Sequence, residues 1–236
     1  MSLKLDFCLY GISNMSSENT RSAQKVILPV LLGIISLIVG IWLSQQMLSN
    51  NNDNKIPKNL DATVLPNARP LTGFNLIDHN GEAFGPEQLK GQWSYLFFGF
   101  TNCPDVCPAT LKEMQSMWKS LPTKQGMTGH PKLYFVSVDP DRDPPETLKK
   151  YVQFFNSEFI GLSGHLDQID KLTRQIGILY GYDEKENNDD KEYIVNHSSQ
   201  LILVDPKGRM RAVISPPHIS KTIANNFQTI RTFYGD

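Results

Sequence analysis

The chain has 236 residues, of which 40% are hydrophobic and 20% are charged, a composition typical of a globular protein rather than of a disordered or fibrous one. Its 23 basic and 24 acidic residues give a formal net charge of −1, so the chain has no surplus of positive charge for a phosphate backbone. We therefore exclude nucleic acid as a partner. Three cysteines are too few for a fold that is held together by disulfides.

An uncharged stretch near the N-terminus predicts a membrane anchor. Residues 26–43 read VILPVLLGIISLIVGIWL, and as a helix they would be about 27 Å long, close to the thickness of a bilayer's hydrocarbon core. Lys4, Arg21 and Lys25 precede the stretch, which favours a cytoplasmic N-terminus. No small-residue cleavage site follows it, which favours an uncleaved anchor. We expect a single-pass protein of a bacterial inner membrane, with its C-terminal domain in the periplasm.

We expect four segments along the chain. A cytoplasmic segment covers residues 1–25, a transmembrane anchor 26–46, a flexible tether 47–69 and a folded domain 70–236. The tether is assigned from its composition, because it is rich in Asn, contains several prolines and has few bulky apolar residues.

The folded domain mixes strand and helix patterns. Continuous apolar runs at 93–100 and 132–139 predict strands that are buried on both faces. Two hairpins are predicted within 71–85, at Asn80-Gly81, and within 201–214. Helical patterns cover 106–121, 143–155, a segment that begins near Asp167, and 219–232. A strand, helix, strand unit followed by an antiparallel hairpin predicts an α/β domain with three layers, of the thioredoxin type.

Two cysteines stand close together in TNCPDVCP. Cys103 is expected in the loop that leaves the first central strand, and Cys107 in the first turn of the next helix, where the helix N-terminus favours a thiolate. Two buried thiols or an inert disulfide would be the structural explanation. A proline-bracketed loop at the carboxyl end of a strand favours redox or metal chemistry instead. Cys8 lies apart from this pair, near the N-terminus.

A third ligand could come from one of five histidines. His197 precedes the strand predicted at the start of 201–214, and a thioredoxin-like fold would bring it near the cysteines, although a lone histidine is more often structural. Two thiolates and an imidazole would suit Cu(I), and they are incomplete for structural zinc, which takes four protein ligands. The other histidines are expected at the surface; they are His79, His130, His165 and His218.

Three motifs in this order resemble the Sco/SenC family over roughly residues 62–232: FFGFTNCPDVCP, VSVDPDRDPPETL and YIVNHSSQLILVDPKG. The resemblance implies a thioredoxin fold that binds one copper ion, as Cu(I) or Cu(II), through Cys103, Cys107 and His197. It also implies a part in assembling the CuA centre of cytochrome c oxidase subunit II. Further partners would be another copper chaperone or a thioredoxin-like reductant. The chain has Asn102 where many members of the family carry a histidine.

Two functions remain open from the sequence. One is a membrane-anchored copper metallochaperone, and the other is a thiol:disulfide oxidoreductase that reduces the CuA-site cysteines without carrying copper. Thioredoxin-type enzymes usually have two residues between their cysteines and a proline before the late strand. Here three residues separate the cysteines, and His197-Ser198-Ser199 contains no proline, so the metal is favoured. Whether the protein is also an enzyme stays open.

The acidic motif DPDRDPP allows two interpretations. The resemblance places this loop near the metal, where a carboxylate could tune the site or meet a partner. The local pattern predicts instead that Asp139 ends a strand and that Asp143 caps the following helix. We expect the cap for Asp143 and leave both interpretations open for Asp139.

Overall fold

The computed structural model describes residues 29, 32–45, 60–122, 129–183 and 193–235. The chain divides into two units, Met1–Lys55 and Ile56–Asp236. In the first unit residues 32–45 are helical. Within the described ranges, the structure contains no apolar helix of membrane-spanning length. The predicted cytoplasmic segment and part of the predicted anchor lie outside these ranges, so the anchor stays a prediction.

The second unit is built on a mixed sheet of eight strands, in the order β1-β10-β9-β4-β5-β6-β2-β3. At its centre β4 (Ser94–Gly99) pairs in parallel with β5 (Lys132–Ser137) and antiparallel with β9 (Leu201–Asp205). The outer strands are β10 (Arg209–Ile214), β1 (Thr63–Pro70), β6 (Ile160–Ser163), β2 (Leu76–Asp78) and β3 (Ala83–Phe84). All six residues of β4 are buried, as predicted for a central strand.

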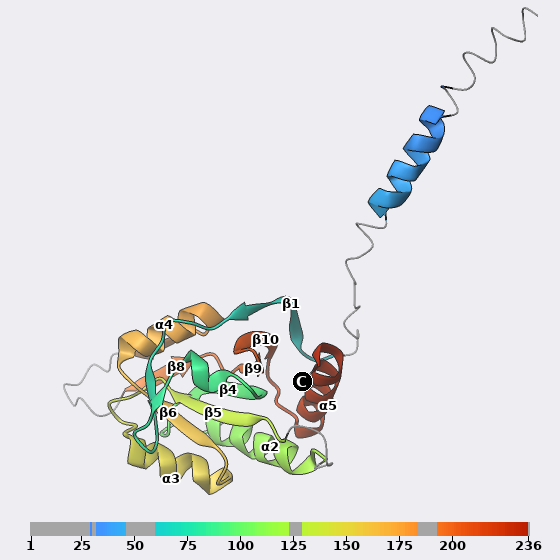
Figure 1. Cartoon of the computed structure of the whole chain (residues 1–236). Helices are drawn as coiled ribbons and strands as arrows, with labels where there is room; N and C mark the ends of the chain where they lie inside the picture. Colours follow the sequence, from blue (N-terminus) through green and yellow to red (C-terminus); the bar gives the residue numbers. More distant parts are fainter. Residues whose placement is uncertain (1–28, 30–31, 46–59, 123–128, 184–192, 236) are drawn as a thin grey trace, which may run out of the picture. The chain divides into compact units, whose positions relative to one another are not determined.

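Helices cover both faces of this sheet (Figure 1). One face carries α2 (Val106–Ser120), α3 (Pro145–Phe155) and α5 (Ser220–Tyr234), and the other carries α4 (Leu166–Ile176). Side chains alternate along β4, so Tyr95 and Phe97 join the core under the three helices, whereas Leu96 and Phe98 join the core under α4. This arrangement confirms the predicted three-layer, thioredoxin-like fold. A short 3₁₀ helix, η1 (Pro86–Leu89), precedes β4.

A second, two-stranded sheet stands beside the large one. It consists of β7 (Tyr180–Asp183) and β8 (Ile194–His197), which pair antiparallel with Tyr180 opposite His197. The sequence analysis did not predict this hairpin.

The predicted start of the folded domain at residue 70 is too late. Residues 63–69, expected in the tether, belong to β1, which pairs antiparallel with β10 from Thr63 opposite Val213 to Pro70 opposite Arg209. An edge strand tolerates proline and polar residues because one side of it needs no partner. Composition alone therefore made this strand look like a linker. Residues 47–59 of the expected tether lie outside the described ranges.

Candidate metal centre

The two cysteines lie where β4 gives way to α2. The backbone N–H of Cys103 donates to the carbonyl of Phe100 at 3.2 Å, which closes the loop after β4. The backbone N–H of Cys107, in the first turn of α2, donates to Cys103 Sγ at 3.4 Å. The N-terminus of α2 therefore faces the first sulfur, as the sequence predicts. Cys107 is fully buried, Cys103 is partly exposed, and both are free thiols.

Gly99 makes room for the buried thiol. A Cβ atom at this position would lie 2.5 Å from Cys107 Sγ and 2.9 Å from the ring of Phe135, both far closer than atoms pack. The last residue of β4 must therefore be a glycine for Cys107 to sit against the strand. Sequence reasoning did not single out Gly99, because the sequence around a glycine at a strand end does not show which side chain will pack against its Cα.

His197 ends β8 and points its ring at the cysteines. Its Nδ1 lies 3.2 Å from the carbonyl oxygen of Ser198, and because a carbonyl can only accept, this nitrogen carries the proton. Nε2 therefore keeps a free lone pair, and it lies 3.5 Å from Cys107 Sγ. The donor atoms of Cys103, Cys107 and His197 all lie within 4.8 Å of one another, so the structure brings the three predicted site residues together.

The two thiols differ in their affinity for protons. Hydrogen bonding with the Cys107 side chain is the largest influence on Cys103 and lowers its pKa well below the ordinary range, with help from the backbone N–H groups of Cys107 and Asp105 and against the opposing effect of burial. The same hydrogen bond and burial raise the pKa of Cys107, so the expected preference for a thiolate holds for Cys103 and is wrong for Cys107. The metal-free site thus holds one thiolate, on the more exposed sulfur, and one protonated thiol beside the lone pair of His197.

These donors fit a soft, three-coordinate metal ion. Thiolate and imidazole are ligands that Cu(I) accepts, and three protein ligands leave a structural zinc site incomplete. At the lengths of zinc bonds to the same kinds of donor, about 2.0 to 2.3 Å, three ligands around one ion would have donor atoms about 3.5 to 4 Å apart. The 3.5 Å between Cys107 Sγ and His197 Nε2 meets this requirement. The third donor atom, Cys103 Sγ, lies within 4.8 Å of both.

Asp143 does not cap α3, contrary to our expectation. The residue before that helix is Pro144, which makes no side-chain cap. The carboxylate of Asp143 is fully buried and accepts hydrogen bonds from the backbone N–H of Thr101 at 3.0 Å and from the Ser137 hydroxyl at 2.7 Å. It thereby fastens the start of the cysteine loop to the end of β5. Burial raises its pKa, against these hydrogen bonds.

Asp139 lies outside the group of donor atoms, which consists of Cys103, Cys107 and His197. Its side chain is 1% exposed and pairs with Arg142, whose Nε lies 2.5 Å from Asp139 Oδ2. The hydroxyl of Tyr193 donates to its other carboxylate oxygen. β5 ends at Ser137, two residues before Asp139, so the predicted strand is shorter at its end than expected and both interpretations of Asp139 remain predictions.

The other histidines take different positions. The prediction that His79 lies at the surface is wrong. Its side chain is only 7% exposed, and its Nδ1 accepts a hydrogen bond from the N–H of Gly161 at 3.1 Å. His165 is exposed, as expected. His218 lies 2.7 Å from the carbonyl of Ser199.

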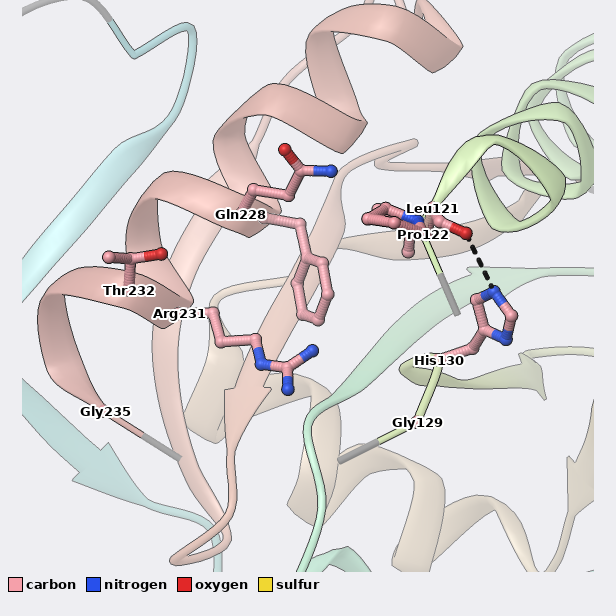
Figure 2. A pocket seen from close by; sticks show the side chains of 9 residues that line it. Leu121, Pro122, Gly129, His130, Gln228, Arg231, Thr232 and Gly235 are labelled. Atoms are coloured by element: carbon pink, nitrogen blue, oxygen red, sulfur yellow. Dashed lines mark hydrogen bonds between the residues drawn. The ribbon is translucent and has the colours of Figure 1, made fainter. Parts of the chain in front are cut away.

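A separate cavity of about 210 Å³ lies between the C-terminal ends of α2 and α5 (Figure 2). His130 and Arg231 line it, and the imidazole of His130 lies 3.4 Å from the carbonyl of Leu121. The described residues of its wall include no cysteine and no carboxylate side chain, so it does not offer the soft donor set of the cysteine site.

A thioredoxin-like domain that brings two cysteines at the end of its central strand together with a histidine from a separate hairpin defines a class of proteins that bind a soft metal or exchange thiols. The family comparison is more specific. The SCO1/SenC family model matches residues 65–232, and the chain belongs to this family.

Individual relatives agree with the family assignment. The chain is 36% identical over 177 residues to a SCO2-like protein of Rickettsia prowazekii, which covers 75% of this chain and 84% of that protein. Protein sco1 of Schizosaccharomyces pombe is 28% identical over 226 residues, covering 91% and 82%. Among solved structures, Arabidopsis thaliana ScoI with copper bound matches at 30% identity and a TM-score of 0.62, covering 69% of this chain and 99% of that one. Yeast Sco1 with copper bound matches at 30% identity and 0.60, covering 67% and 87%.

Proposed function

We propose that this chain is a membrane-anchored copper metallochaperone that holds one copper ion and delivers it to the CuA centre of cytochrome c oxidase subunit II. The convergence of Cys103, Cys107 and His197 within 4.8 Å is the observation that carries this proposal. Two structures of family members with copper bound, from Arabidopsis and yeast, support the choice of metal. The recipient, the upstream copper chaperone and the periplasmic location rest on the family resemblance and on the predicted anchor.

In this proposal copper is the cargo, and the chain's residues determine how it is held and released. Cys103 meets the ion as a thiolate, and Cys107 gives up its proton on binding, so uptake releases one proton to solvent. His197 supplies Nε2 because Ser198 holds the Nδ1 proton. Three ligands leave a side of the ion open, and an acceptor's thiolates enter there before the donor sulfurs leave. A hollow beside His197 is lined also by Leu179 and Asn196.

An anaerobic Cu(I) titration of the full chain against a competing chelator tests this proposal. We expect one tight equivalent. Cys103→Ser and Cys107→Ser should abolish tight binding, because each removes a thiolate ligand, and His197→Ala should weaken it. A matched control is His165→Ala, which removes an exposed imidazole away from the donor set. Weak binding by the unaltered chain, or an unchanged affinity in the His197 variant, would contradict the proposed site.

Thiol exchange is the second candidate, and the unequal thiols favour it. Cys103 is the more exposed sulfur and holds its thiolate readily, so it can attack a target disulfide and release one target thiolate. Cys107 then loses its proton and attacks the mixed disulfide. The target leaves with both cysteines reduced, and the chain keeps a Cys103–Cys107 disulfide. A metal-free chain that stoichiometrically reduces a disulfide peptide with the CuA-site sequence, yet binds Cu(I) weakly, would establish this function instead.

A further inference from the structure

The strand that carries His197 is not hydrogen-bonded to the main sheet. In the described residues, β8 pairs only with β7, and these two strands form a sheet of their own. Backbone pairing therefore fixes His197 relative to Tyr180, but not relative to the cysteines, which lie at the end of β4. Some other set of contacts must hold the β7–β8 hairpin in register with the cysteine loop.

Alternate residues of β8 face the body of the domain. Side chains two apart share a face of a strand, so Tyr193, just before β8, lies on the same side as Val195 and His197. Val195 is 5% exposed and belongs to the core under α4. Tyr193 packs against the same core. The hairpin is thus held from its inner face, with Tyr193 at one end and His197 at the other.

Arg142 contacts this inner face at Tyr193. Its guanidinium lies over the Tyr193 ring, 3.7 Å from the centroid, and its Nη1 donates to the Tyr193 carbonyl at 3.1 Å. Its Nε is paired with Asp139 at 2.5 Å, and Asp139 also accepts from the Tyr193 hydroxyl. Asp139 is 1% exposed, so this anchor sits in a site where water competes little. A planar guanidinium is suited to making a ring contact and these two directed contacts together.

The same guanidinium reaches the cysteine side of the site. It lies 5.9 Å from the centroid of the Phe100 ring. Phe100 in turn meets the His197 imidazole edge to face, with ring centroids 5.8 Å apart and an interplanar angle of 88°. The carbonyl of Phe100 accepts the Cys103 N–H, so this ring belongs to the loop that presents the first sulfur. Arg142 therefore touches both the hairpin of His197 and the loop of the cysteines.

We propose that Arg142 is a positioning residue for His197. It clamps the β7–β8 hairpin to the loop after β5 and, through the Phe100 ring, sets the His197 imidazole so that Nε2 lies within reach of Cys107 Sγ. Asp139 is the fixed point of this clamp and does not bind the metal. The consequence for copper rests on the proposed function. The consequence for the hairpin does not, because the contacts exist in the metal-free chain.

The first measurement uses the metal-free full chain. Arg142→Gln removes both the planar guanidinium and its charge. Arg142→Lys keeps a positive charge but has no planar guanidinium. We expect both variants to raise the rate of backbone amide hydrogen exchange in residues 194–197 relative to that in β4. Lys150→Gln is the control for loss of a surface charge, since Lys150 makes an exposed ion pair with Glu146 on α3. Unchanged exchange in both Arg142 variants would overturn the clamp.

The second measurement is a double-mutant cycle on Cu(I) affinity. We expect Arg142→Gln and Arg142→Lys each to weaken binding by about 10-fold, within the range that residues behind metal ligands contribute. In a His197→Ala background neither change should weaken binding further, because Arg142 acts through that imidazole. An equal loss in both backgrounds would show that Arg142 acts by charge or on the whole fold, and would overturn the proposal.

These arms separate the two proposals. If the unaltered chain binds Cu(I) weakly, the proposed copper carrier fails, and the exchange rates of β8 still decide whether Arg142 holds the hairpin. If Arg142→Gln does not fold, Arg142→Lys decides by the same two measurements. Tight binding in the unaltered chain, with no effect of either Arg142 variant, would leave the carrier intact and remove Arg142 from its positioning role.

Discussion

Two residues at the site are not ligands but determine where the cysteine sulfurs lie. Gly99 contributes no ligand, yet the space above its Cα is filled by Cys107 Sγ. Asp143 contributes no ligand either, yet it holds Thr101, two residues before Cys103. The positions of the two sulfurs thus depend on one missing Cβ atom and on one buried carboxylate.

Gly99→Ala should damage the site selectively. The new methyl group would collide with Cys107 Sγ and with Phe135, so the free energy of unfolding should fall by about 1 to 3 kcal/mol, as for other overpacked cores. Because the sulfur itself must move, Cu(I) affinity should fall as well. Urea denaturation and the chelator titration measure the two effects.

Gly161→Ala is the control for this crowding. A Cβ atom there would lie 2.9 Å from Leu148 Cβ, so the fold is strained where β6 meets α3, and no site cysteine is among the atoms it meets. We expect a comparable loss of stability with Cu(I) affinity unchanged. Equal Cu(I) affinity in the Gly99 and Gly161 variants would show that Gly99 serves the core and not the site.

At the scale of elements, a buried histidine ties the β2–β3 hairpin to β6. The N–H of His79 donates to the carbonyl of Gly161 at 2.9 Å, and the N–H of Gly161 donates back to His79 Nδ1 at 3.1 Å. Protonation of Nδ1 would replace this acceptor with a donor that faces another donor. Burial lowers the pKa of His79 from its ordinary 6.5; nearby Asp78 acts in the opposite direction, and Lys149 adds to the lowering.

This pairing predicts an acid-sensitive contribution to stability. With the folded-state pKa below 6.5, the unfolded chain takes up the proton first as the pH falls. The stability that His79 contributes is therefore fully present above pH 6.5 and is lost as the pH falls through the lower folded-state pKa. His79→Asn keeps an acceptor for Gly161 and does not titrate, so its free energy of unfolding should change less between pH 7.5 and 5. The control is His165→Asn, at an exposed histidine, which should show the same pH dependence as the unaltered chain. If the His79 variant also showed the pH dependence of the unaltered chain, the role of the His79 imidazole would be refuted.

The elements that could be predicted are those whose own residues supply the signal. The apolar runs of β4 and β5 and the periodic face of α2 need no knowledge of their neighbours. β1 and the β7–β8 hairpin could not be predicted because contacts with distant parts of the chain stabilise them. β1 pairs with β10 alone among the described strands, and β8 is held by Arg142 and by the packing of its own Val195 in the core. Tertiary contacts outweigh the local pattern in such strands.

The candidate site too has a part that local sequence predicts and a part that depends on contacts between distant residues. Cys103 and Cys107 are close in sequence, so their meeting could be inferred from one motif. His197 lies 90 residues from Cys107, and its assignment rested on the family resemblance until the structure placed Nε2 near the sulfur. The hydrogen bond between Thr101 and Asp143 spans 42 residues, and a helix-capping pattern had offered another explanation for Asp143. No local pattern distinguishes a capping carboxylate from one that reaches across the sheet.

At the scale of the whole molecule, the candidate copper site and the predicted membrane anchor fall in different units. Cys103, Cys107 and His197 lie in Ile56–Asp236, together with both hydrophobic cores. The predicted anchor and Cys8 lie in Met1–Lys55.

Deletion of residues 1–55 should therefore separate the two properties. The full chain should sediment with membranes and the shortened chain should stay in solution, because the 18 uncharged residues from 26 to 43 are the only stretch of that kind in the sequence. Cu(I) affinity and the stoichiometry of one should be the same in both, since the donor set is complete without Cys8. A shortened chain that still sediments would place membrane contact in the folded unit. A lower copper stoichiometry after the deletion would bring Cys8 into the copper chemistry, and the three-ligand site would then account for only part of the binding.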